Sequence, residues 1–279
     1  MKIDYDSPMG NYVAVPHSDL PPETSQPAPP SRRRSRWAVA PATYILIAIN
    51  CLWFVYMTAR GVSFTSPTGE QLMHFGADNA GSVLYHGEWY RIFTAMFVHA
   101  GILHLSVNMW CLWNLGLLAE PLMSSLGVFA VYLLTGTAGN LLSNLVNWYS
   151  YHVSGDFPAC VGASGAVFGI AGALIILLKS KRLPVPPDDL HKLRRSVIYF
   201  AAINLGLGFT ISLTSRLTGI SIDNMAHLGG VSCGLLFAMP MVPRLGSPRS
   251  DFQTRLRLAI GVVVGILILF TFYIHTVVR

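Results

Sequence analysis

The chain has 279 residues, of which 52% are hydrophobic and 11% are charged, and its formal net charge is +6. Soluble chains usually have about 25% charged residues, so this composition argues against a water-soluble enzyme, a disordered chain and a nucleic-acid-binding module. The few charged residues are also unevenly spread, which leaves long stretches of the chain without any charge.

Residues 1–36 differ in composition from the rest of the chain. They hold seven of the 17 prolines, together with many Ser, Asp and Arg residues. Residues 1–36 contain too few apolar side chains to form a folded core, so we predict a disordered N-terminal tail. The first apolar stretch follows this tail and is long enough to stay in the membrane, so we expect it to target and anchor the chain without cleavage.

Seven stretches of the chain contain no Lys, Arg, Asp or Glu, and each has at least 20 residues. About 20 apolar residues in a helix cross the roughly 30 Å hydrocarbon core of a bilayer. We therefore predict an all-α polytopic membrane protein with seven transmembrane helices. They are expected within residues 37–59, 92–119, 121–155, 157–178, 196–215, 224–243 and 258–278.

The basic residues sort by loop if the N-terminus is cytoplasmic. Fifteen of the 19 then lie on the inner side, in the tail and in the loops after the fourth and sixth spans. The other four are Arg60, Arg91, Arg216 and Arg279. This positive-inside pattern predicts a cytoplasmic N-terminus and an external C-terminus. It also accounts for the net charge better than a basic face for nucleic acid does.

Three connecting segments have a distinctive composition. Residues 61–90, on the outer side, are rich in apolar and aromatic residues and are expected to form an ordered loop at the membrane interface. Glu120 and Pro121 predict a tight turn between the second and third spans. Residues 179–195, with three prolines, predict the longest interior loop.

Polar residues are rare inside the predicted spans, and because they are costly there they mark candidate functional positions. Ser164 in the fourth span and His227 in the sixth are each expected four residues from the outer end. At 1.5 Å per residue both would lie about 6 Å below the outer interface. His104 lies at similar depth in the second span, and Asn108 lies four residues later on the same helical face.

A serine and a histidine at equal depth form the minimal arrangement for nucleophilic catalysis. The imidazole takes the proton of the hydroxyl and can return it to a leaving amine. The Ser164 N–H near a helix N-terminus, the Asn108 amide and the His104 ring are candidate donors to the oxyanion. Gly162 and Gly165 would allow a substrate backbone to approach closely.

Each of these signals alone also fits a structural role. The glycines near Ser164 fit a small-residue seam between helices, and the histidines and Asn108 fit structural hydrogen bonds. A metal site formed by His99, His104 and His227 is a further alternative. Zinc sites usually include a carboxylate or thiolate as well, and no HExxH motif occurs. We therefore predict neither a metal nor a cofactor.

Four motifs occur in chain order. They are Glu88-Trp89-Tyr90-Arg91, an HxxxxHLxxNM pattern that starts at His99, Gly162-Ala163-Ser164-Gly165, and an AHxxGxxxG pattern that starts at Ala226. Together they resemble the motifs of the rhomboid family of intramembrane serine proteases. The resemblance covers about residues 40–243. It implies a six-helix core over 37–243, a basic cytoplasmic linker over 244–257 and an extra C-terminal transmembrane helix over 258–279.

The resemblance implies roles for individual residues. Ser164 would be the nucleophile and His227 the general base of a dyad without a partner acid, while His104 and Asn108 would join the oxyanion hole. Phe168 stands where relatives often have Tyr, so its ring is expected to pack on the histidine. The remaining matched positions would support the site or the fold: Gly162, Gly165, Trp89, Arg91, Glu120, Gly230 and Gly234.

The resemblance further implies an intramembrane serine endopeptidase that cleaves single-span membrane proteins near the outer face of the bilayer. Its partners would be transmembrane substrates and membrane lipid, and we expect a bacterial plasma membrane. One alternative is an inactive relative that acts in binding or quality control, but such relatives typically lack the serine or the histidine. A transporter or channel would be expected to have more intramembrane charge or repeated, broken helices.

Overall fold

The computed structural model of the protein describes residues 40–180, 186–218, 223–242 and 249–278, with all side chains except those of 152–154, 209–218 and 249. The predicted disordered tail, residues 1–36, lies outside this part of the chain. The helices are α1 (Pro41–Ala59), α2 (Gly69–His74), α3 (Ala80–Leu84), α4 (Arg91–Thr94), α5 (Ile102–Ser154), α6 (Ser164–Leu177), α7 (Pro187–Thr218), α8 (Asn224–Ala238) and α9 (Arg249–Val278). The described residues thus confirm the predicted all-α class.

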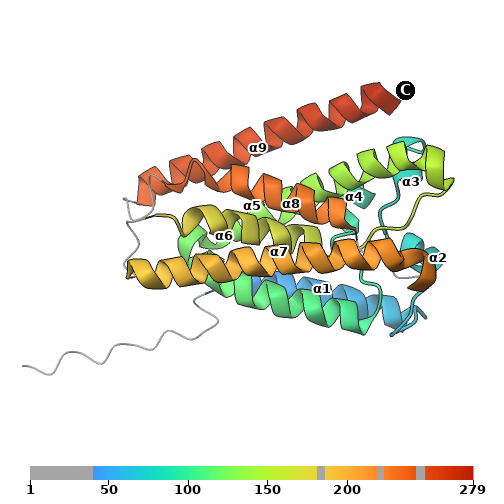
Figure 1. Ribbon diagram of the computed structural model, residues 1–279, viewed down its shortest axis with the longest axis horizontal. Helices are drawn as coiled ribbons and strands as arrows, with labels where there is room; N and C mark the ends of the chain where they lie inside the picture. The colour runs from blue at the N-terminus through green and yellow to red at the C-terminus, as the bar shows by residue number, and fades with distance from the viewer. Residues whose placement is uncertain (1–39, 181–185, 219–222, 243–248, 279) are drawn as a thin grey trace, which may run out of the picture. The chain divides into compact units, whose positions relative to one another are not determined.

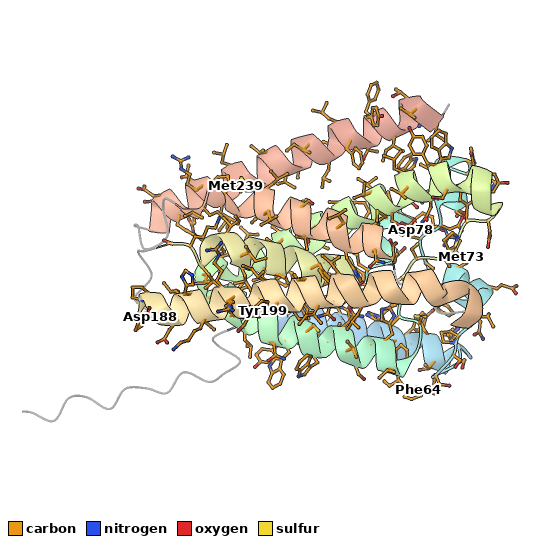
Figure 2. The ribbon with its side chains drawn as sticks, in the orientation of Figure 1. Phe64, Met73, Asp78, Asp188, Tyr199 and Met239 are labelled. Carbon is orange, nitrogen blue, oxygen red and sulfur yellow. The ribbon has the colours of Figure 1, made fainter. Side chains whose placement is uncertain are left out.

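The long helices run roughly alongside one another (Figure 1). Helices α6 and α8 pack against each other and both pack against α5, which also contacts α1 and α9. The short helices α2 and α3 lie at one end of the long helices, called here the α2–α3 end. Figure 2 places Met73 and Asp78 at this end and Asp188, at the start of α7, toward the opposite end.

Helix α5 contains two helices joined at Ser124. This residue has a left-handed φ of 68° and a ψ of 167°, which interrupts the helix. His104 in the first half and Asn144 in the second both contact residues at the α2–α3 end, so the chain reverses between them. The helices predicted over 92–119 and 121–155 are therefore both found in α5.

One predicted boundary within α5 is wrong. The reversal lies at Ser124 rather than at Glu120 and Pro121, because the backbone leaves the helical conformation at Ser124, and the Ser125 hydroxyl donates to Glu120 across this turn. The first half of α5 begins at Ile102, inside the predicted window 92–119, since the preceding Gly101 has a φ of 97° that ends the irregular segment. A window free of charge therefore includes loop as well as helix.

Helices α7 and α9 begin earlier than predicted. The predicted interior loop over 179–195 ends at the helical Pro187, and the predicted linker over 244–257 is helical from Arg249. Proline is well suited to the first turn of a helix, and Asp188 and Asp189 favour the positive end of the helix dipole. Charged residues mark the edge of an apolar segment, but they do not stop a helix.

Three described helices are long and apolar enough to cross a membrane: Pro41–Ala59, Ile102–Tyr151 and Ser250–Val278. Residues Ser164–Leu177 form a shorter apolar helix. The core between the helices is apolar, and its fully buried members include Leu112, Tyr132, Leu174 and Phe237. These helices indicate a polytopic membrane fold.

The segment between α1 and α5 is ordered, as its aromatic composition predicts. Thr68 and Gln71 form a capping box at α2, and Asn79 caps α3. Asp78 is fully buried, accepts both hydrogen bonds of the Asn144 amide group and pairs its backbone with Cys160. Burial raises the pKa of the Asp78 carboxyl to about 7, against the opposing effect of the Asn144 hydrogen bonds.

Candidate active site

Ser164 and His227 lie in hydrogen-bond contact. The His227 Nε2 atom is 2.8 Å from the Ser164 Oγ atom. Ser164 is the first residue of α6 and His227 is the fourth of α8. The predicted depth of four residues into a helix is therefore wrong for Ser164, because a loop in which Gly162 has a φ of 116° leads directly to it. The predicted approach of the two side chains is nevertheless present.

Glycines allow α6 and α8 to approach closely enough for this contact. A Cβ atom at Gly230 would overlap the carbonyl oxygen of Gly165, and one at Gly234 would overlap that of Gly169. At Gly165 itself a Cβ would lie 3.2 Å from the Ala226 carbonyl oxygen. Because serine has a short side chain, the imidazole can reach it only if the two backbones are this close.

The His227 ring stacks on Phe168, one turn after Ser164. The ring centroids are 4.3 Å apart and the planes differ by 14°, so the expected packing is present. The Phe168 ring also contacts Phe200 of α7 at 5.9 Å. The Nδ1 atom of His227 is buried and has no hydrogen-bond partner among the described residues. Stacking and the serine contact thus hold the ring.

His104 lies beside the loop that leads to Ser164. A Cβ atom at Gly162 would be 2.7 Å from the His104 Cε1 atom, so a glycine is needed there for space as well as for its φ. Asn108 is buried one turn later, and its Nδ2 donates to the His104 carbonyl oxygen at 2.9 Å. One of the two amide hydrogens is therefore used within the helix, which leaves the other for a different acceptor.

The motif residues in the segment before α5 organise that segment. Arg91 donates to Glu88 at 2.6 Å and to the carbonyl oxygens of Met73 and Ala77 at 2.8 and 2.9 Å. The hydrogen bond from Arg91 lowers the pKa of the Glu88 carboxyl. Trp89 is partly buried, and its ring centroid lies 6.4 Å from that of His275 in α9. These residues support the loop rather than contact the Ser164–His227 pair.

Glu120 lies at the junction of α1 and α5. Its carboxylate accepts hydrogen bonds from the N–H groups of Ala42 and Thr43 and from the hydroxyls of Thr43 and Ser125, at 2.7 to 2.9 Å. Ala42 and Thr43 are in the first turn of α1, whose N-cap residue Ala40 offers no side-chain cap. Glu120 therefore caps α1 from another helix and is structural.

Asp223 and Ser143 also belong to the neighbourhood of the site, although the motifs do not include them. Asp223 caps α8 by accepting from the Ala226 N–H at 2.9 Å, and it accepts from the Ser143 hydroxyl at 2.6 Å. The position of Asp223 just before an apolar run is a helix-start signal. Ser143 has no comparable signal, since its partner is 80 residues away.

No group of three His, Cys, Asp or Glu side chains within the described ranges is arranged to hold a metal ion. A cavity of about 610 Å³ lies between α9 and α5, lined mainly by apolar residues such as Phe93, Leu134 and Leu267. Neither Ser164 nor His227 lines it.

Comparisons with known proteins identify the family of this chain. The Rhomboid domain profile matches residues 86–244, which is more than half of the chain. The chain is 32% identical over 231 residues to Rhomboid protease GluP of Bacillus subtilis (strain 168), covering 83% of this chain and 40% of GluP. It is 26% identical over 226 residues to Rhomboid protease AarA of Providencia stuartii, covering 76% of each.

A plant relative, RHOMBOID-like protein 1 of Arabidopsis thaliana, is 29% identical over 191 residues, covering 68% of this chain and 44% of the relative. The chain thus spans less than half the length of GluP and of this plant protein. With its apolar helices and the profile match, the chain is an integral membrane protein that belongs to the rhomboid family.

Proposed function

We propose that the chain is an intramembrane serine endopeptidase in which Ser164 and His227 form the catalytic dyad. The observation that carries this proposal is the 2.8 Å contact between Ser164 Oγ and His227 Nε2, at the start of an apolar helix in a rhomboid-family chain. GluP and AarA are named as proteases, which supports the same reaction class for this chain. An inactive relative is disfavoured because both side chains are present and in contact.

The reaction follows from this contact. His227 Nε2 accepts the Ser164 proton while Oγ attacks the carbonyl carbon of the substrate peptide bond. The oxyanion that forms is stabilised by the Ser164 N–H, which the geometry of a helix N-terminus leaves without an intrahelical acceptor. The His104 ring and the second Asn108 amide hydrogen add further donors. His227 then returns the proton to the leaving amine, and water repeats the sequence on the acyl-enzyme.

The proposed topology places this chemistry near the outer face of the membrane. In it α1, the two halves of α5, α6, α7, α8 and α9 form seven spans, and the N-terminus is cytoplasmic. The basic residues of the loops after α6 and α8, and of the N-terminal parts of α7 and α9, support this direction. Hydrolysis requires water that the hydrocarbon core lacks, so the dyad must be reached from the α2–α3 end. The substrates are single-span membrane proteins, and a bacterial plasma membrane is the proposed location.

The test is cleavage of a model transmembrane substrate by the purified protein in lipid vesicles. The parent should cleave it and should be labelled by a fluorophosphonate probe, and Ser164→Ala should abolish both. Ser106→Ala is the matched control, because Ser106 is an exposed serine near the start of α5 and should leave both activities unchanged. Cleavage by Ser164→Ala at the parental rate would exclude Ser164 as the nucleophile.

A further inference from the structure

The helix that carries His227 is anchored at its first turn by one carboxylate. Asp223 precedes α8, and its Oδ1 accepts a hydrogen bond from the Ala226 N–H at 2.9 Å. The His227 N–H in turn donates to the Asp223 carbonyl oxygen at 3.3 Å. Asp223 therefore closes the turn that ends at His227, as an N-cap residue does.

The second oxygen of the same carboxylate binds a different helix. Asp223 Oδ2 accepts from the Ser143 hydroxyl at 2.6 Å, and Ser143 lies in the second half of α5. Ser143 is itself buried and also accepts a hydrogen bond from the Asn147 side chain at 3.1 Å. The carboxylate thus bridges α8 to α5 through a hydroxyl that is held in place.

The position of α8 matters for the dyad because little else fixes the imidazole. His227 Nδ1 has no hydrogen-bond partner within the described part of the chain, so no side chain holds the far side of the ring. The stack on Phe168 contacts the face of the ring and makes no hydrogen bond to either ring nitrogen. An α-helix rises 1.5 Å and turns about 100° per residue, so a small shift of the first turn of α8 moves the His227 ring by a comparable distance. Such a movement would break the 2.8 Å contact between His227 Nε2 and Ser164 Oγ.

We infer that Asp223 is a positioning residue, which holds the first turn of α8 against Ser143 so that His227 Nε2 stays within hydrogen-bond distance of Ser164 Oγ. This inference rests on the proposed dyad. Asp223 is not a third catalytic member, since its two oxygens are bound to Ala226 and Ser143. Its action is geometric, so an amide of the same shape can replace it.

Three variants test the bridge, measured as kcat and KM for a transmembrane substrate in lipid vesicles. Asp223→Ala should lower kcat by about 10- to 100-fold with little change in KM, since a displacement of about 1 Å can cost 100-fold. Asp223→Asn should restore most of kcat, because its oxygen can accept from Ala226 and its amide can donate to Ser143. Ser143→Ala should lower kcat by about 10-fold, because the cap remains and only the bridge is lost.

Thr137→Val is the matched control. Thr137 is a buried hydroxyl on the same half of α5, but it donates to Leu133 of its own helix at 2.8 Å, so kcat should not change. A parental kcat in Ser143→Ala, or an Asp223→Asn variant as slow as Asp223→Ala, would overturn the inference. Ser143→Ala decides the question if Asp223→Ala does not fold. Failure of the dyad itself would appear separately, as cleavage by Ser164→Ala.

Discussion

The Glu120 carboxylate and the Ser164–His227 pair are both polar groups at the first turn of a helix, Glu120 at that of α1 and the pair at those of α6 and α8, but their hydrogen bonding differs. The Glu120 carboxylate accepts four hydrogen bonds, three of them from Ala42 and Thr43 in the first turn of α1. His227 has one polar side-chain contact, to Ser164, and its Nδ1 has no partner among the described residues. Both oxygens of the Glu120 carboxylate thus have hydrogen-bond donors, whereas the His227 ring is hydrogen-bonded only through Nε2, to the Ser164 hydroxyl.

The difference shows how a structural anchor and the proposed dyad are built with similar groups. A buried carboxylate with both oxygens hydrogen-bonded cannot be moved without losing those bonds, so it fixes α1 to α5. The dyad is instead held by the surrounding backbone, through glycine contacts between α6 and α8 that contribute no polar group to the reaction. In the proposed dyad, support from the backbone would leave Ser164 Oγ and His227 Nε2 free to exchange a proton.

The first way to test this contrast is Glu120→Ala, which should have the largest effect on stability. Four donors would lose their acceptor, and breaking a buried charged contact of this kind costs about 3 to 5 kcal/mol. Thermal or denaturant unfolding in detergent measures the loss, and turnover per folded molecule should be kept. Glu120→Gln should lose less, because its amide oxygen can still accept. A large fall in turnover without loss of stability would contradict the structural role.

Asn108→Ala should show the opposite pattern. As an oxyanion donor it should lower kcat by about 100- to 1,000-fold with KM nearly unchanged, because the donor acts mainly in the transition state. Asn114→Ala is the matched control, since Asn114 makes the same contact to the carbonyl four residues before it but is exposed. If both variants keep the parental kcat, Asn108 has only the structural bond to His104.

The smallest expected effect concerns Asp78, a buried carboxyl with two partners and a raised pKa. Its pKa rises from 3.8 to about 7 on folding, so the folded state holds the proton over a range where the unfolded state has released it. Stability should therefore fall as pH increases through this range, by on the order of 2 kcal/mol between about pH 5 and about pH 7. Asp78→Asn should flatten the pH dependence of the melting temperature. An unchanged slope in that variant would mean that another group causes it.

Charge spacing alone located most of the helices. The stretches without charge contain the apolar parts of α1, α5, α6, α7, α8 and α9, because a membrane excludes charge along a whole span. Helix ends were predicted less well. α7 and α9 begin among the charged residues that were expected to lie in loops, and the reversal in α5 falls at Ser124. The reason is that a helix ends where its backbone is capped or interrupted and not where hydrophobicity stops.

The sequence by itself determined which groups could react, because the GxSG and AHxxG motifs name a serine, a histidine and the glycines that let two backbones meet. Tertiary structure decided how they meet. Only the fold places Ser164 at the first residue of α6, brings Gly230 against Gly165 and joins Asp223 to a serine 80 residues away. A membrane-spanning helix must be apolar along its own length, so its sequence alone reveals it. A hydrogen bond between distant residues depends on how closely whole helices pack, which the sequence of one segment does not show.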